Sequence, residues 1–347
     1  NPDLLPEKTN SIEAGLEFNL FESRVGADIA IYKTNSFNQI MGVDVSRGSG
    51  YTSLILNGGE IENKGLEIAA YFVPVRSGDF EWKLNVNWFA NRNMVISLPN
   101  DIDNYQLFSN WDVSINAKEG EPYGNIQGSD YVWTDGQRTV QDNGYLMVGD
   151  NPLANIGNTQ QDWNMGIGNA LTWKGIRLYA LIDIQKGGDI YSVNTKYGQA
   201  TGVYAETAGN NPKGNPQRDP VDEGGGNIFE DAVFEDGTAN DVYIPAYRWG
   251  RYWYYSNSPT ARYVFDGSYV KLRELSLSYS LPGTVLGDSF IRGVEVAMVG
   301  RNLWIISKNV EHFDPEAAKS TAGNLQGIES GAYPTARTLG LNLRLTF

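Results

Sequence analysis

The sequence predicts an all-β protein, a transmembrane antiparallel β-barrel to which this chain contributes about nine strands. Apolar and polar residues alternate with a period of two in segments slightly longer than ordinary strands. Short and long connections between these segments follow one another in strict order. The chain also has 9 Trp, 20 Tyr, 13 Phe and 39 Gly. This composition is typical of strands that face lipid on one side and carry aromatic girdles near their ends.

The last segment alternates most clearly, with leucine at every second position from Leu339 to Leu345, followed by Phe347. Gly, Asn, Arg and Thr stand between them. In a soluble sandwich this would be a half-buried strand, whereas in a membrane barrel the apolar face meets lipid and the polar face lines the lumen. The same pattern predicts nine strands, near residues 11–21, 25–33, 62–72, 80–91, 163–173, 176–185, 269–281, 293–304 and 337–347.

The connections alternate in length. Short turns are expected near residues 22–23, 75–78, 174–175 and 282–292. Long loops are expected near residues 37–58, 93–160, 190–267 and 307–335. Compact soluble domains rarely contain structureless loops longer than ~15 residues. Tight periplasmic turns alternating with long extracellular loops are typical of outer-membrane barrels, so the C-terminus is expected in the periplasm.

Nine strands are an odd number, and the alternation begins on a downward strand that has no earlier partner. An open sheet edge in lipid would leave backbone groups unpaired at several kcal/mol each. The chain begins Asn1-Pro2-Asp3, with neither the basic nor the apolar region of a signal peptide. We therefore expect a longer protein whose N-terminal part supplies the remaining strands.

Composition opposes several classes of function. The chain has no cysteine, so neither disulfides nor thiolate metal sites are expected, and His312 is its single histidine. A net charge of −14 opposes nucleic-acid binding, because phosphate recognition needs clustered Lys and Arg. No window reaches ~18 consecutive apolar residues, so no transmembrane helix is predicted. We expect no metal, no cofactor and no nucleic-acid partner.

Charged residues occur on the predicted lumen faces of the strands. The candidate lumen-lining residues are Glu13, Glu17, Asp28, Glu67, Lys83, Arg177, Asp183, Glu274, Glu295, Arg301 and Arg344. They could line a translocation path or hold and release a plug. The alternative interpretation is that barrel interiors are simply polar and wet. A pair of catalytic carboxylates, as in glycosidases, is not indicated, because nothing distinguishes two of them from the rest.

The longest predicted loop contains a dense aromatic run with arginine. Its candidate ligand or partner contacts are Tyr247, Arg248, Trp249, Arg251, Tyr252 and Trp253. Aromatic rings beside Arg suit sugar stacking or a protein interface, and interface or loop packing is the favoured interpretation. The acidic stretch near 135–144 departs from EF-hand spacing, and the glycines at 224–226 lack the Lys-Ser/Thr of a phosphate loop. Both are interpreted as surface turns.

Phe347 ends the most clearly alternating strand. A C-terminal Phe in this position resembles the signal by which outer-membrane barrels are recognised for insertion. Chance is the alternative explanation. His312, which lies in the last long loop, is expected to form structural hydrogen bonds because no second histidine or cysteine accompanies it.

Several stretches, in order along the chain, resemble the SusC/RagA family of TonB-dependent outer-membrane transporters. They are NPDL and PEKT at 1–9, NGGEIENKGLE at 57–67, GDIY at 188–191, YVKLRELSLSY at 269–279, GRNLW at 300–304, FDPE at 313–316, GAYPTAR at 331–337 and the terminal aromatic strand. Each alone is a weak signal. Their order and their spread over nearly the whole chain make the set specific.

The resemblance implies a barrel of about 22 strands with an N-terminal plug in its lumen. This chain would be its C-terminal portion, with the plug and the first strands absent. A TonB box before the plug would receive energy from the inner membrane, and a SusD-like surface lipoprotein would cover the barrel. The implied function is active import of a large nutrient, an oligosaccharide or a peptide, across the outer membrane of a Gram-negative bacterium, where lipid and lipopolysaccharide surround the barrel. No enzyme activity is implied.

Two functions of other classes stay open at this point. A surface-exposed barrel enzyme would need a convergent set of Ser, His and Asp or of carboxylates on its loops, and the single histidine opposes it. A passive porin or adhesin would need no plug, and porins are complete at about 16–18 strands. The acidic loops mildly favour neutral or basic cargo but do not choose between oligosaccharide and peptide.

Overall fold

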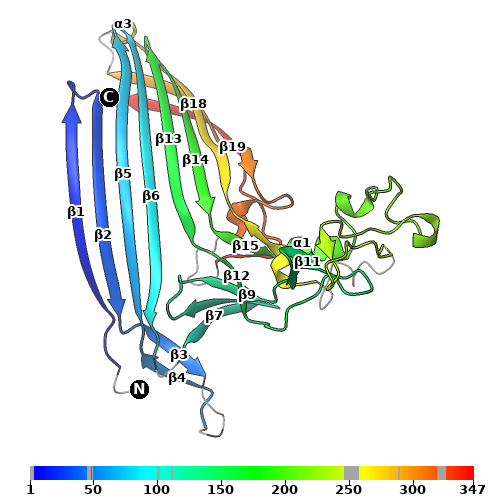
Figure 1. Ribbon diagram of the computed structural model, residues 1–347. Coiled ribbons are helices and arrows are strands. Elements are labelled where there is room, and N and C mark those ends of the chain that lie inside the picture. Colours follow the sequence, from blue (N-terminus) through cyan, green and yellow to red (C-terminus); the bar gives the residue numbers. More distant parts are fainter. Residues whose placement is uncertain are drawn as a thin grey trace.

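The computed structural model describes residues 4–44, 48, 50–99, 102–110, 112–245, 258–287, 290–318 and 326–347. Nine strands form one sheet in which every neighbouring pair is antiparallel (Figure 1). In spatial order they are β1 (Lys8–Leu20), β2 (Val25–Phe37), β5 (Glu60–Ser77), β6 (Phe80–Ser97), β13 (Gln161–Trp173), β14 (Ile176–Gly187), β18 (Tyr269–Ser280), β19 (Gly293–Lys308) and β21 (Thr338–Thr346).

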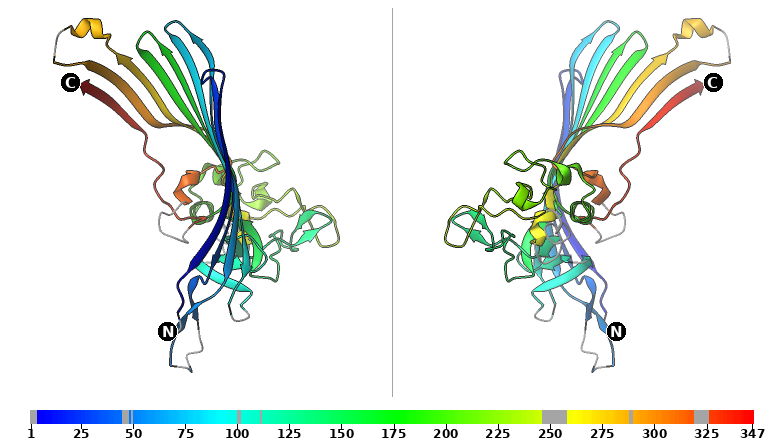
Figure 2. Two further views of the ribbon diagram at one scale, coloured as in Figure 1. Left: turned by 90° about the vertical axis from the view of Figure 1, so that its left-hand side faces the viewer. Right: turned by 90° about the vertical axis from the view of Figure 1, so that its right-hand side faces the viewer.

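The chain is mostly β and its main sheet is antiparallel, as predicted from the sequence, but this sheet is open and does not close into a barrel by itself. The outer strands β1 and β21 each pair with one neighbour and not with each other. Each of the nine expected ranges overlaps one strand of this sheet. The two views in Figure 2 show that the sheet is strongly twisted and curved along its length.

Strands β5 and β6 have 18 residues each, well beyond the expected 62–72 and 80–91. At ~3.3 Å per residue they extend ~60 Å, about twice the thickness of a bilayer core. The expectation was too short because it followed hydrophobic alternation. In β6 that alternation ends where both faces become polar, at Asn91-Arg92-Asn93, although the backbone pairing with β5 continues.

The tight turns gather at one end of the sheet, with the C-terminus, and the long connections lie toward the other end (Figure 1). Lys174 and Gly175 join β13 to β14 with φ of 48° and 82°, the left-handed geometry that a two-residue hairpin turn requires. The turn after β1 has three successive residues with positive φ, Phe21, Glu22 and Ser23. A short helix, α3 (Gly283–Leu286), lies between β18 and β19.

The long connections contain secondary structure of their own, which the sequence did not predict. They contribute β3 (Ile40–Asp44), β4 (Ser53–Asn57), β7 (Asn104–Asn110), β8 (Val113–Lys118), β9 (Asn125–Gly128), β10 (Trp133–Thr134), β11 (Gln137–Thr139), β12 (Ala154–Asn158), β15 (Asp189–Ser192), β16 (Ala232–Val233), β17 (Val264–Asp266) and β20 (Ile328–Glu329). These form a hairpin and three small sheets. Helix α1 (Val193–Ala200) and the 3₁₀ turns Ala205–Ala208, Val221–Glu223, Thr260–Tyr263 and Pro315–Ala318 complete this layer.

The hydrophobic cores lie in this folded layer. One joins Val113, Ile115 and Ile126 to Tyr191 and Tyr263. A second contains Val140, Tyr145, Leu146, Phe229, Ala232 and Ile244. A third contains Ile190, Val310 and Phe313. Each core combines residues from connections far apart in the sequence, so the long connections support one another.

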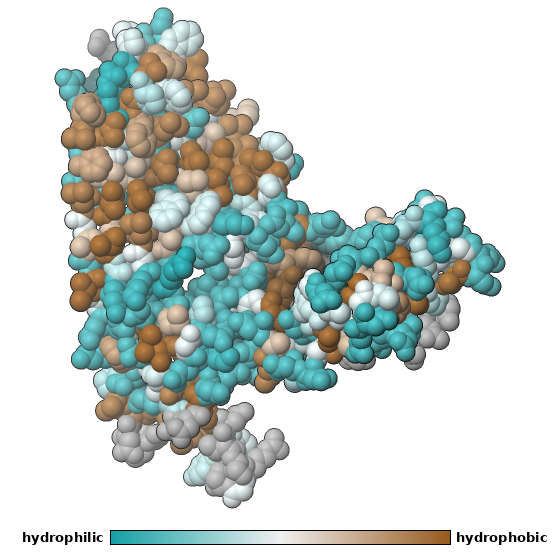
Figure 3. Space-filling model, in the orientation of Figure 1, coloured by the Kyte–Doolittle hydropathy of each residue, from teal (hydrophilic) through white to brown (hydrophobic). Residues whose placement is uncertain are grey.

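The surface of the molecule divides along the strands. Apolar side chains gather over the strands toward the end with the tight turns, and polar side chains dominate the end with the long connections (Figure 3). In the part of the chain that the structure describes, no helix has both the length and the apolarity needed to cross a membrane.

Candidate functional site

All eleven predicted lumen-lining residues lie on one face of the sheet. Residues directly opposite each other in antiparallel strands share a face. One continuous row of such pairs runs through Glu17, Asp28, Ala69, Asn87, Gly166, Asp183 and Lys271. The same register and period-two alternation place Glu13, Glu67, Lys83, Arg177, Glu274, Glu295, Arg301 and Arg344 on this face, called here the polar face.

The opposite face is apolar and uncovered. Its exposed side chains include Ile12, Leu16, Ile31, Leu277, Met298 and Leu341, each more than half accessible. Trp173, beside a tight turn, and Trp304, toward the other end of its strand, are also on this face and exposed. Because apolar surface costs about 25 cal/mol per Å² in water, this face suits lipid. Tryptophan at both ends of the apolar zone suits the two interfaces of a bilayer.

Charges on the polar face are distributed unevenly. Arg301 Nε donates to Glu274 Oε2 at 3.1 Å, and Arg344 stands opposite Glu295 in register. By contrast, Glu13, Glu17, Asp28 and Glu67 have no ion pair among the described residues, and Glu17 stands directly opposite Asp28. Like charges in direct register destabilise a strand pair. Strands β1, β2 and β5 therefore carry an excess of negative charge on the polar face.

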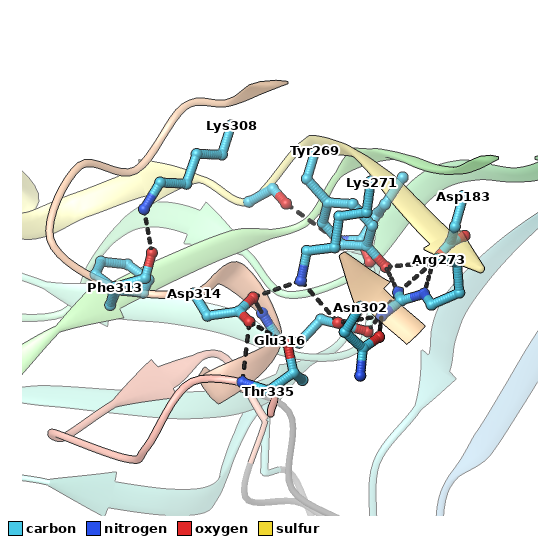
Figure 4. A network of polar contacts seen from close by, with 12 residues as sticks. Asp183, Tyr269, Lys271, Arg273, Asn302, Lys308, Phe313, Asp314, Glu316 and Thr335 are labelled. Carbon is cyan, nitrogen blue, oxygen red and sulfur yellow. Dashed lines mark hydrogen bonds and ion pairs between the residues drawn. The ribbon is translucent and has the colours of Figure 1, made fainter. Parts of the chain in front are cut away.

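Asp183 belongs to a larger network that the sequence analysis did not find (Figure 4). Lys271 Nζ of β18 donates to Asp314 Oδ1 at 2.5 Å and to Glu316 Oε2 at 2.7 Å. Arg273 donates to both carboxylate oxygens of Glu316, at 2.8 and 2.9 Å, and from Nε to Asp183 Oδ2 at 3.0 Å. The network joins the barrel wall to the connection between β19 and β21.

Two bulges position the cations of the network. The register of β18 slips between Leu272 and Glu274, so Arg273 is an extra residue in its strand. The neighbouring β19 slips at the same level, where Asn302 has φ of 50°. Arg273 Nη1 donates to Asn302 Oδ1 at 3.1 Å, which connects the two bulges. A bulge breaks the period of two and redirects a side chain, which is why alternation alone did not predict Arg273.

Asp314 is fully enclosed by donors. Its side chain is 2% exposed and that of Lys271 is 3% exposed. Thr335 donates to Asp314 Oδ2 from both its backbone N and its Oγ1, at 3.2 and 2.7 Å. Burial alone would raise the pKa of the Asp314 carboxyl, but the hydrogen bonds from Lys271, Thr335 and the Glu316 backbone outweigh it and hold the pKa at about 2. Burial likewise opposes ionisation of Glu316, whose pKa is nevertheless lowered by Arg273 and Lys271.

The sign of this effect follows from linkage. A carboxyl whose folded pKa is depressed stabilises the fold above its unfolded pKa, ~3.9 for Asp, and loses that contribution as pH falls toward the folded value. The Asp314 carboxylate is therefore ionised at neutral pH, and its contribution to stability is lost only as pH falls from about 4 toward about 2. At physiological pH the Asp314 carboxylate therefore continues to hold the connection between β19 and β21 against β18.

Three further predicted features lie elsewhere. The aromatic and arginine run Tyr247, Arg248, Trp249, Arg251, Tyr252 and Trp253 lies outside the described residues. His312 Nε2 lies 2.8 Å from Glu206 Oε1, and the His312 ring stacks on Tyr204 at 3.7 Å, so this histidine connects two long connections. Phe347 is exposed and stacks on Phe290, with ring centroids 5.7 Å apart.

A polar cavity of about 500 Å³ lies where β6 and β13 separate. Its lining residues are Asn91, Arg92, Asn93, Met94, Pro122, Asn158, Gln160, Gln161, Asp162, Lys186, Gly187, Gly188, Asp189 and Asp266. Within the described ranges, no group of three or more His, Asp or Glu side chains is arranged to hold a metal ion.

Comparison with known proteins gives a consistent result, although no protein-family model matches the chain. Over its whole length the chain is 25% identical to TonB-dependent receptor P26 and 27% identical to TonB-dependent receptor P3, both of Formosa agariphila, and it spans 35% of each. It is 24% identical to TonB-dependent receptor SusC of Bacteroides thetaiotaomicron and spans 32% of it. Its fold matches a chain of the RagAB peptide transporter with a TM-score of 0.71 at 20% identity, covering 100% of this chain and 36% of that one.

Along its whole length, the chain therefore resembles part of the TonB-dependent receptors of the SusC/RagA type, and its antiparallel sheet has the fold of part of the RagA barrel. The chain spans about a third of the relatives that it matches. The resemblance inferred from the ordered motifs is thereby confirmed.

Proposed function

We propose that this chain is the C-terminal wall of a transporter that uses TonB-derived energy to import a large nutrient, an oligosaccharide or a peptide, across the outer membrane. The observation that carries the proposal is the continuous polar face, on which eleven predicted charged residues share one register across the sheet. A wall with lipid-compatible side chains outside and charges inside suits a hydrated path.

The complete transporter would have about 22 strands and a plugged lumen. Because the outer strands β1 and β21 are unpaired with each other, further strands would close the barrel and satisfy their backbone groups. The unpaired acidic residues of β1, β2 and β5 would face the plug or the passing substrate. A SusD-like surface lipoprotein would cover the folded outer layer. The matched RagAB peptide importer, solved in "closed-closed" and "open-open" states, supports a transporter that opens and closes.

The orientation follows from the asymmetry of the connections. Tight turns and the C-terminus would lie in the periplasm, and the long, folded connections outside the cell. The network around Lys271 would then hold the last extracellular connection against the wall, and Phe347 would act as the insertion signal at the periplasmic end.

Growth of a deletion strain on a panel of glycans and peptides tests the proposal. The strain is expected to fail on one substrate class, and a strain lacking TonB is expected to fail on the same class. Re-expression of the full-length transporter should restore growth. Growth of the deletion strain on every substrate would contradict the proposed import, and uptake that persists without TonB would indicate a passive pore.

A further inference from the structure

The interior strand β6 has a free edge. Its pairing with β13 ends at Phe89 opposite Asn164, yet β6 continues to Ser97, and over this last part β5 is its one partner strand among the described residues. On the side of β13, the next backbone partner is Glu121, whose carbonyl accepts from Val95 N at 3.0 Å. Along residues 90–94, among the described residues, no strand or loop backbone pairs with this edge. Native proteins normally cover free edges, because unpaired N–H and C=O groups recruit another chain.

The free edge forms one wall of the polar cavity described above, called here the β6 cleft. Asn91 to Met94 line one side, and Asp162 with Gly187, Gly188 and Asp189 lines the other. Tyr123 N donates to Asn93 Oδ1, and Asn158 N donates to Asp189 Oδ2, both at 2.9 Å. These bonds attach the folded outer layer to both walls. The cleft is therefore pre-formed, and its volume of about 500 Å³ is within the usual range for ligand sites.

Glycine keeps the far wall in place. Gly187 and Gly188 turn the chain from β14 into β15 with φ of 75° and 83°. A Cβ on Gly187 would lie 2.9 Å from the backbone N of Asp162, and this contact together with the positive φ favours glycine here. Residues 188–191 form one of the motifs that carried the family resemblance. The turn accounts for Gly188, the first residue of this motif, because φ of 83° favours glycine.

Some of the charged side chains that line the β6 cleft have no partner among the described residues. The Arg92 guanidinium and the Asp162 carboxylate line it, are exposed, and have no hydrogen bond or ion pair among the described residues. Asp162, Asp189 and Asp266 gather there, whereas Lys186 is engaged with Asp266 at 3.3 Å. Burial, with a smaller effect of the Asp266 and Asp162 carboxylates, raises the pKa of Asp189. The cleft therefore disfavours anions and offers hydrogen bonds along its length.

We propose that the β6 cleft binds an extended peptide, which adds as a short strand to the free edge of β6 over residues 90–94. The proposal rests on the proposed import function and names the substrate class for this site. Strand addition supplies main-chain hydrogen bonds independent of sequence, and about five edge residues at ~3.3 Å each accommodate a peptide segment of ~16 Å. Aromatic platforms, which suit sugar rings, are absent from the residues that line the cleft.

Recognition of the peptide main chain can be tested with the full-length transporter purified together with its SusD-like lipoprotein. The probe is a fluorescein-labelled set of decapeptides composed of Gly, Ser, Asn and Lys, and its affinity is measured by anisotropy. N-methylation of alternate residues removes the donors that strand addition needs but keeps the side chains. We expect at least one of the two alternating N-methylated sets to bind at least tenfold more weakly than the parent set.

A cleft-filling variant gives a second measurement. Asp162→Trp should weaken peptide binding at least tenfold, whereas Asp222→Trp, an exposed residue of the 3₁₀ turn Val221–Glu223 that does not line the cleft, should leave it within twofold. Both variants should reach the outer membrane at wild-type levels. If Asp162→Trp does not fold, the N-methylated peptides still test the proposal on the wild-type protein.

Three outcomes overturn the inference: equal binding of methylated and parent peptides, no peptide binding to the wild type, or displacement of the peptide by a neutral oligosaccharide such as maltoheptaose. None of these three outcomes contradicts the proposed import function. TonB-dependent growth on a glycan together with any of these outcomes would leave the transporter proposal standing and refute only the peptide site. If growth on every glycan and every peptide were independent of the transporter and of TonB, the transporter proposal itself would be refuted.

Discussion

Lys271 holds the most enclosed charge in the described part of the wall. Its ammonium contacts Asp314 and Glu316 of the connection between β19 and β21, while Arg273 donates to both carboxylate oxygens of Glu316. Transferring such ions out of water costs several kcal/mol each, and the cost is offset only when every group has a partner. All these carboxylate oxygens have donors, so the network holds its connection in one position.

Replacing Lys271 by Met should destabilise the protein by about 3–5 kcal/mol, because Asp314 would remain charged and buried without its main partner. The urea midpoint of the folded transporter in lipid bilayers measures the effect. Lys33→Met is the matched control, because Lys33 is about half exposed and Glu62 keeps Lys64 as a second ion-pair partner, so this change should matter little. Equal midpoints for the two variants would show that the network does not fasten the connection.

Sequence reasoning found Asp183 but not its partners. Asp183 follows the period of two, and so its face could be predicted. Arg273 stands at a bulge, and Asp314 and Glu316 lie in a connection, so no periodicity indicated their positions. The only signal was that 269–279 and 313–316 both carry family motifs. A motif with two cations at alternate positions, paired with a separate motif holding two carboxylates, could have suggested the ion pairs.

At the scale of elements, the strands were predictable because their signal is local. Each strand needs only its own alternation and a turn at each end. The folded connections were not predictable, because their cores join distant segments: Tyr191 and Tyr263 pack with Val113, Ile115 and Ile126. Short strands such as β10 and β16, of two residues each, carry no periodicity that a sequence window could detect.

The terminal strand β21 supports a prediction about assembly. All nine residues of β21 are exposed, and Phe347 follows directly after its last residue. Deleting Phe347 should lower the amount of transporter in the outer membrane several-fold, because the insertion signal would be lost. Quantitative immunoblotting of outer-membrane fractions measures this, and Phe290→Ala controls for loss of the ring contact with Phe347 alone. Unchanged levels after the deletion would count against Phe347 as an insertion signal.

The two faces of the whole sheet make the assignment of lipid and lumen testable. Leu277 lies on the apolar face and its neighbour Ser276 on the polar face of the same strand. Leu277→Lys should cost up to about 2–4 kcal/mol, the value for lysine near mid-bilayer, whereas Ser276→Lys should be tolerated in the hydrated lumen. Folding titrations into lipid vesicles measure both variants. A larger loss for Ser276→Lys would reverse the assignment of the faces.

The sequence by itself determined the class of fold, the nine strands and the face on which each of the eleven charged residues lies. Alternation is a local property that the backbone converts directly into two faces. Only the tertiary structure decided three features: the length of β5 and β6 beyond the apolar zone, the network around Lys271, and the β6 cleft. Bulges, diverging strands and cores between distant connections arise from contacts across the chain, and these leave no period in the sequence.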